Sequence, residues 1–192
     1  MDINILLDRL PQYTQNGHRI RTDFRESIKF ELLMQDNKID ERNKVEQALR
    51  LYYYDLSKIT DIKKAIDEVV WFYSCGKNKE VDNKTKKNNN KEKKQIYSYE
   101  FDAEYIYSAF LQQYKIDLNS TRYMHWWKFK ALMENLNEDT QFVKIMGYRA
   151  VDISKIKDKE EKARYKKLKK TYALPDMRTT EQKEADFGKA FW

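Results

Sequence analysis

Few side chains in this sequence have the types and spacing that covalent or metal chemistry requires. The 192 residues include two histidines, His18 and His125, and one cysteine, Cys75. No Cys–His or His–His pair has the spacing of zinc ligands, and neither a glycine-rich phosphate loop nor a dinucleotide fingerprint is present. Cys75 and His125 would together make a nucleophile and its base, but nothing else in the sequence supports that pair. We therefore expect a non-enzymatic protein without metal or cofactor.

The lysines are the other chemically notable side chains, and they gather in two segments. Residues 77–94 carry eight Lys against three acids, and residues 155–170 carry nine Lys or Arg against three acids. The formal net charge of the whole chain is +7, so the remaining residues sum to −4. Lysines interleaved with Tyr165 would attract phosphates, but no DNA-reading motif is present. Nucleic-acid binding is therefore only a third hypothesis.

The most apolar stretch of the chain lies within residues 120–148. Its aromatic, Met and Leu side chains are Tyr123, Met124, Trp126, Trp127, Phe129, Leu132 and Met133. Wound as a helix they leave almost no polar face, which is typical of a core centre or of the buried side of an interface. Asn119 and Ser120 are expected to cap this helix. Asn137 is expected to cap a second, shorter one that Gly147 ends.

The elements that must position these residues are predicted to be mainly helical. The sequence has only four Gly and two Pro, which disfavours a multi-stranded sheet. Apolar residues at helical spacing predict helices over residues 2–10, 22–35, 40–54, 60–76, 102–114 and 158–172. Asn16–Gly17 predicts a type I′ turn and hence a small β-hairpin over residues 12–21.

These elements predict one helical bundle-like domain in two parts. The N-terminal part is residues 1–76 with the hairpin, and the C-terminal part, residues 95–175, packs on it, followed by a tail over 176–192. Residues 77–94 contain five Asn and eight Lys with one apolar residue. Such a segment cannot bury enough surface to offset its chain entropy, which predicts a disordered, flexible loop. No apolar run approaches the roughly 20 residues of a membrane span, so no membrane partner is expected.

Two runs in the central stretch are distinctive as sequences. They are YMHWWKFKAL, residues 123–132, and FVKIMGYR, residues 142–149. Together they resemble the bacteriophage gene-product-fifteen family of tailed phages. The resemblance extends over residues 99–107, Phe110 and residues 117–118, and it includes Asn16–Gly17 and residues 22–25 near the N-terminus. It covers nearly the whole chain except the Lys/Asn-rich loop.

The resemblance implies a role in phage tail morphogenesis. Phages and prophages of Gram-positive bacteria encode the family near the tape measure gene, the position used by tail assembly chaperones. The implied partners are the tape measure protein, a companion tail assembly protein and the tail tube protein. The implied location is the cytoplasm of the bacterial host, with the protein absent from the mature virion. The alternative is a structural virion protein of the tail or connector.

An assembly chaperone needs apolar surface that accepts amphipathic helices. The aromatic and Met residues of the central stretch are the candidates for that surface. The predicted partner-binding residues are Tyr123, His125, Trp126, Trp127, Phe129, Met133, Phe142, Met146 and Tyr148. The same residues would equally suit the protein's own core, and the sequence leaves both interpretations open.

Overall fold

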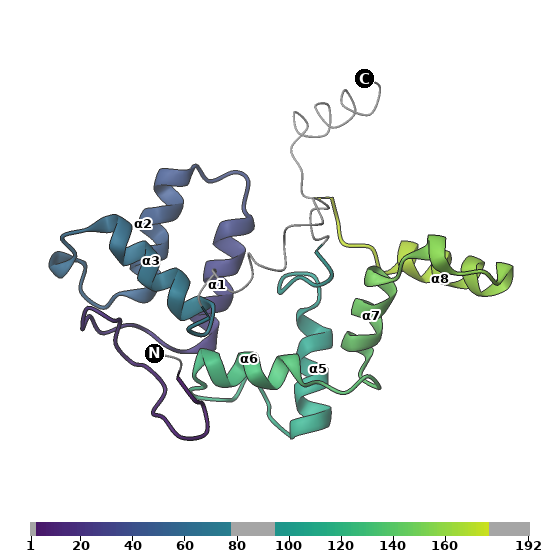
Figure 1. Ribbon diagram of the computed structural model, residues 1–192, viewed down its shortest axis with the longest axis horizontal. Coiled ribbons are helices and arrows are strands. Elements are labelled where there is room, and N and C mark those ends of the chain that lie inside the picture. The colour runs from purple at the N-terminus through teal and green to yellow at the C-terminus, as the bar shows by residue number, and fades with distance from the viewer. Residues whose placement is uncertain (1–2, 78–94, 177–192) are drawn as a thin grey trace.

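The computed structural model describes residues 3–77 and 95–176 (Figure 1). Within these ranges the chain forms seven α-helices and two short 3-10 helices, and no sheet. The predicted, mainly helical fold class is thus confirmed. The predicted loop and tail lie outside the described residues, apart from Lys77 and Asp176. The α-helices are α1 (Phe24–Gln35), α2 (Glu41–Tyr52), α3 (Ile62–Tyr73), α5 (Ala103–Tyr114), α6 (Trp126–Glu134), α7 (Gln141–Ala150) and α8 (Lys159–Thr171).

Aspartates set the start of four helices. The carboxylates of Asp23, Asp40, Asp61 and Asp158 each accept a hydrogen bond from a backbone N–H in the first turn of α1, α2, α3 and α8. Such caps satisfy donors that the helix itself leaves unpaired. The helix predicted over residues 40–54 does begin at its first residue, with Asp40 as the cap, whereas the caps Asp23 and Asp61 lie one residue after the predicted starts at 22 and 60.

The predicted β-hairpin over residues 12–21 is wrong. The chain does turn, with Thr14 N donating to His18 O at 2.8 Å, but Tyr13 and Arg19 form only an isolated bridge. A type I′ turn needs positive φ at both central residues. Gly17 has φ of 81°, but Asn16 stays at negative φ and donates from its backbone and side chain to Glu68.

The short helix predicted over residues 2–10 is also absent from its described part. Residues 5–8 form a turn in which Asn4 N donates to Asp8 Oδ2 at 2.8 Å. Leu6 and Leu7 are 89% and 82% exposed, so they find no core face to pack against. A helix of this length gains most of its stability from such packing, which explains why it does not form.

The central helix begins later than predicted, at Trp126. Asn119 and Ser120 do not cap it, because both donate backbone N–H bonds to Asp117 in a turn. Residues 122–125 then run beside residues 22–24: Phe24 N donates to Met124 O at 2.9 Å, and Trp126 N donates to Thr22 O at 2.8 Å. This pairing occupies the backbone until His125 caps α6.

The next helix is also displaced from its prediction. Thr140, not Asn137, caps α7, and its hydroxyl accepts from Val143 N. Gly147 lies inside α7 and does not end it. Asn137 N instead donates to the side chain of Gln113 on α5 at 2.7 Å. Asn137 is therefore held against α5, and α7 begins only after Thr140, three residues later.

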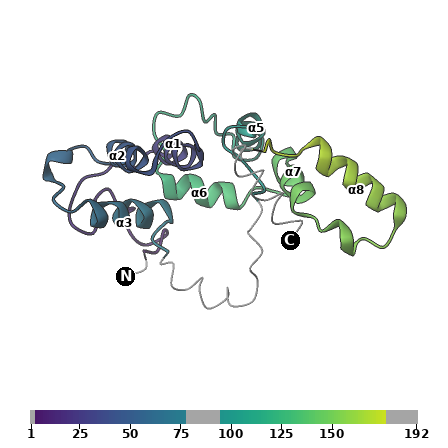
Figure 2. The same cartoon turned by 90° about the horizontal axis from the view of Figure 1, so that it is seen from above.

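The helices are arranged around α6 in an elongated molecule. The N-terminal helices α1, α2 and α3 pack on one another, and α6 lies alongside α1 (Figures 1 and 2). On the other side α5 packs on α7, and α7 packs on α8 at the far end. No helix within the described ranges is long and apolar enough to cross a membrane.

Candidate interaction site

The predicted partner-binding residues are distributed between the core and its margin. His125, Trp126, Trp127, Phe129, Met133 and Phe142 are all buried in this structure. Met146 and Tyr148 are half-buried, and Tyr123 is 54% exposed. The structure therefore brings most of these residues together, but as an aromatic core and not as an open groove.

The two indoles fasten α6 to the end of α3. Trp126 Nε1 donates to Tyr73 O and Trp127 Nε1 donates to Phe72 O, both at 2.8 Å. The last carbonyls of a helix have no partner within it, and a buried indole needs an acceptor. Each indole N–H therefore has a partner, and Phe72 O additionally accepts from Cys75 N at 3.1 Å. Gly76 leaves room for this contact, since a Cβ added there would lie 3.0 Å from Trp127 Cη2.

His125 acts as the N-cap of α6 with both ring nitrogens engaged. Its Nδ1 accepts from Trp127 N at 3.1 Å, and Nε2 lies 3.0 Å from Pro11 O. Because Nδ1 accepts, Nε2 carries the proton and donates to the carbonyl. Burial holds the pKa of His125 below its usual range. The imidazole is therefore a fixed, neutral structural group.

Phe129 is the centre of a stack of rings. Its ring centroid lies 4.7 Å from Phe24, 5.0 Å from Phe110 and 5.7 Å from Trp126, with the ring planes within 20° of parallel. Offset stacks of this kind add to the stabilisation from apolar burial. Phe129 thereby joins α1, α5 and α6 in one core.

The remaining predicted residues connect this core with the far end of the molecule. Tyr99 Oη donates to Met133 Sδ at 3.3 Å, and Tyr148 stacks on Tyr172 with centroids 5.8 Å apart. At the opposite margin the Tyr123 hydroxyl lies 2.8 Å from Thr22 Oγ1. Of the nine residues, Tyr123 presents the most surface to solvent.

The Cys75–His125 pair has no catalytic geometry. Both His125 nitrogens have other partners, as described above, and burial raises the pKa of the Cys75 thiol to about 11. A thiol with that pKa carries almost no nucleophilic thiolate at neutral pH. In the described ranges, no group of three or more His, Cys, Asp or Glu side chains is placed to hold a metal ion.

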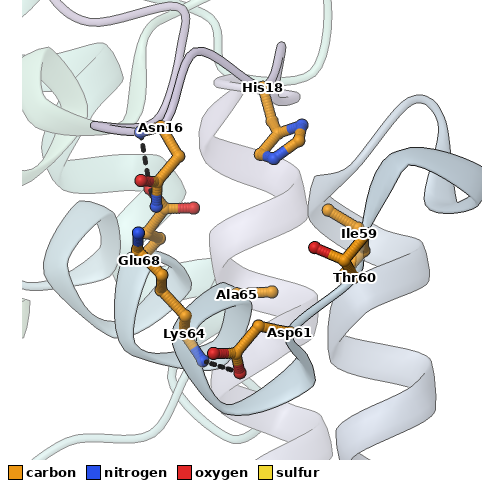
Figure 3. Close-up of a pocket in the computed structure, with 8 residues that line it drawn as sticks. All are labelled: Asn16, His18, Ile59, Thr60, Asp61, Lys64, Ala65 and Glu68. Carbon is orange, nitrogen blue, oxygen red and sulfur yellow. Dashed lines mark hydrogen bonds between the residues drawn. The ribbon is translucent and has the colours of Figure 1, made fainter.

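A small polar pocket of about 170 Å³ lies between the turn near Asn16 and the start of α3 (Figure 3). Its lining residues are Asn16, His18, Ile59, Thr60, Asp61, Lys64, Ala65 and Glu68. Glu68 is buried, and its Oε1 accepts from Asn16 N at 2.8 Å and from Asn16 Nδ2 at 2.5 Å. The carboxylate thus fixes the turn on α3.

Tyr53 completes the bonding of Glu68, with its hydroxyl 3.1 Å from Oε2. Burial and the neighbouring carboxylate both raise the pKa of Tyr53, so the phenol stays protonated. Sequence reasoning missed this site because Asn16 and Glu68 are 52 residues apart. The one available signal was a glutamate beside the apolar stripe of α3.

Comparison with known proteins identifies the family of this chain. No curated protein and no solved structure matches it. The family model described as Bacteriophage Gp15 protein matches residues 6–174, a span that contains every helix described above. Membership indicates a phage structural or morphogenesis protein. The chain belongs to the bacteriophage Gp15 family.

Proposed function

We propose that this protein is a tail assembly chaperone that binds the tape measure protein and assists assembly of the tail tube around it. It acts in the cytoplasm of the bacterial host, with a companion tail assembly protein and the tube protein as further partners. It leaves before the virion matures. The observation that carries the proposal is the family match over residues 6–174. The all-helical fold supports it, since amphipathic helices are recognised by apolar surfaces between or beside helices.

Because the central aromatic residues are mostly buried, the apolar side chains outside the core are the candidates for partner contact. The turn at residues 5–8 exposes Ile5, Leu6 and Leu7, and Tyr123 is exposed at the start of the central stretch. Contiguous exposed apolar groups mark protein-binding sites on soluble proteins. The N-terminal turn is therefore the proposed contact for an apolar helix face of the tape measure protein.

Co-expression tests the proposal directly. The protein is expressed with the tape measure protein of the same phage genome, and we expect a higher soluble yield of the tape measure protein and co-purification of the two. A Leu6→Ser, Leu7→Ser variant should lose co-purification while keeping its thermal midpoint. Ile62→Ser is the matched control, because Ile62 is 59% exposed at the start of α3. Failure to co-purify with any tail protein would overturn the proposal.

Mass spectrometry of purified virions separates a chaperone from a structural component. A chaperone should be missing from mature particles, whereas a protein of the tail or connector should be present at a fixed copy number. Detection at a stoichiometry equal to that of known tail proteins would replace the chaperone proposal by the structural one.

A further inference from the structure

Helix α8 lies at the end of the molecule opposite α1, α2 and α3 (Figures 1 and 2). None of its residues is buried. It contacts α7 through aromatic rings, since the Tyr148 centroid lies 6.3 Å from Tyr165 and 5.8 Å from Tyr172. Leu168 is half-buried on the same side. The opposite side of α8 is therefore open to solvent.

That open side carries a row of lysines. Lys159, Lys162, Lys166 and Lys170 follow one another at the i, i+3, i+7, i+11 spacing that places side chains on one face of a helix. Lys167 flanks the row. We call these five residues the lysine face. At 100° per residue its centre lies opposite Leu168, and all five residues are exposed.

No acidic side chain within the described ranges forms an ion pair with the lysine face. The i,i+4 partners of Lys162 and Arg164 would be Asp158 and Glu160, but neither pair forms an ion pair in the described ranges. Asp158 instead caps α8 by accepting from Glu161 N at 2.7 Å. Among the described residues, the five like charges thus lie side by side without an ion-pair partner.

We propose that the lysine face binds the phosphate backbone of nucleic acid without reading its bases. Ammonium groups are compact point charges that suit phosphates. From Lys159 to Lys170 the row advances eleven positions, or roughly 16 Å of helix at 1.5 Å per residue. Duplex DNA carries one negative charge per about 1.7 Å of axis, so several phosphates lie within that length.

Two further observations favour nucleic acid over an acidic protein. Interfaces between proteins are depleted in lysine and have an apolar centre. The lysine face has no large apolar residue, since Ala163 is the one residue that lies among its lysines. The other side of α8 packs against α7, so the groove of a protein partner cannot surround this helix. The proposed contact is therefore electrostatic, and it is independent of the chaperone proposal.

Fluorescence anisotropy tests this inference. A labelled 30-base-pair duplex of mixed sequence is titrated with the full chain at several NaCl concentrations. The test variant replaces Lys159, Lys162, Lys166 and Lys170 with Gln. The matched control replaces Lys38, Lys63, Lys128 and Lys144 with Gln; these lysines are also exposed but lie elsewhere. Both variants lose four charges, so they differ only in where the charges are lost.

We expect the test variant to bind at least tenfold more weakly at 50 mM NaCl, and the control to stay within threefold of the wild type. The slope of log K against log salt should fall by about 3 to 4 in the test variant, because each phosphate contact contributes about 0.9. Gln and Lys have similar helix propensity, so circular dichroism should stay unchanged. A variant with Arg at the same four positions should restore binding.

Three results would overturn the inference. The wild type could fail to bind the duplex at 50 mM NaCl, or the test and control variants could weaken equally. An acidic helical peptide could also bind the lysine face more tightly than the duplex does. That last result would assign the surface to a protein partner.

Discussion

At the scale of single residues, the central stretch stabilises the fold by pairing polar tips with unsatisfied backbone groups. The indoles of Trp126 and Trp127 complete the C-terminal end of α3, and His125 completes the N-terminal end of α6. Each ring also buries its apolar body. Truncating a residue that does both destabilises the fold, because it leaves a cavity and removes a buried hydrogen bond.

Trp127→Ala is expected to lower the free energy of unfolding by roughly 3–5 kcal/mol. Trp127 is only 4% exposed, and the substitution removes both its core contacts and its bond to Phe72 O. Urea denaturation measures the change. Tyr123→Ala is the control and should cost about 1 kcal/mol, since the exposed Tyr123 loses mainly its bond to Thr22. Unchanged stability in Trp127→Ala together with lost partner binding would instead make Trp127 a contact residue.

Stability should fall between pH 7 and pH 5 because of His125. Burial lowers the pKa of its imidazole in the folded state, so the unfolded chain binds a proton first as the pH falls below about 6.5. The unfolded state therefore gains stability in that window. His125→Asn should flatten this part of the profile, because Asn is a good N-cap that does not titrate.

Chemical denaturation at several pH values measures both proteins. Carboxylates with a lowered pKa, such as Asp117, destabilise the fold only at more acidic pH, below about 4. These carboxylates therefore do not contribute to the change in stability between pH 7 and pH 5. Parallel curves for the wild type and His125→Asn from pH 7 to pH 5 would contradict the assignment.

At the scale of elements, a buried ion pair links the C-terminal helices. Arg149 on α7 makes two bonds to Asp102, the N-cap residue of α5, at 2.6 and 2.8 Å. Its other donors reach Tyr172 O at the end of α8 and Ile96 O. Asp102 also accepts from Ser98 N. One guanidinium therefore connects α5, α7 and the end of α8.

Arg149→Met should lower the free energy of unfolding by about 3–5 kcal/mol, because it leaves the Asp102 carboxylate buried without a cation. Adding Asp102→Asn to that variant should recover part of the loss. The control is Arg50→Met, whose exposed pair with Glu46 should be worth less than about 1 kcal/mol. Thermal and urea unfolding measure all three. Equal losses in Arg149→Met and Arg50→Met would show that the buried pair is not a structural link.

At the scale of the whole molecule, apolar and cationic surfaces lie on different elements. The two most exposed leucines, Leu6 and Leu7, belong to the turn at residues 5–8, and the lysine face belongs to α8. Apolar burial is insensitive to charge screening, whereas contacts between lysine and phosphate are lost as salt rises. The two proposed partners should therefore respond oppositely to ionic strength.

A complex with the tape measure protein is expected to survive a wash in 1 M NaCl, at which the Debye length is only about 3 Å. Binding to duplex DNA should be undetectable at that concentration. The protein is immobilised and loaded with each partner in turn, and the amount of bound partner is measured before and after the wash. Loss of the tape measure protein in high salt would show that its contact is electrostatic and not apolar.

The sequence by itself determined the helical class, the family and several helix starts. Scarce Gly and Pro, apolar stripes at helical spacing and an aspartate before each of four helices are local signals, and they act within a few residues. The exposed, lysine-rich character of α8 is likewise visible in its composition. Local chemistry decides such features, so reading the chain in order recovers them.

Tertiary structure alone decided where α6 begins and what its rings contact. Pairing of residues 122–125 with residues 22–24 delays the helix, and Glu68 holds the turn near Asn16 in a form that is not a type I′ turn. It also placed the indoles in the core, a choice that the residue types left open. Each of these outcomes depends on partners about 50 to 100 residues away, because a backbone N–H or an apolar ring takes the nearest suitable partner in space.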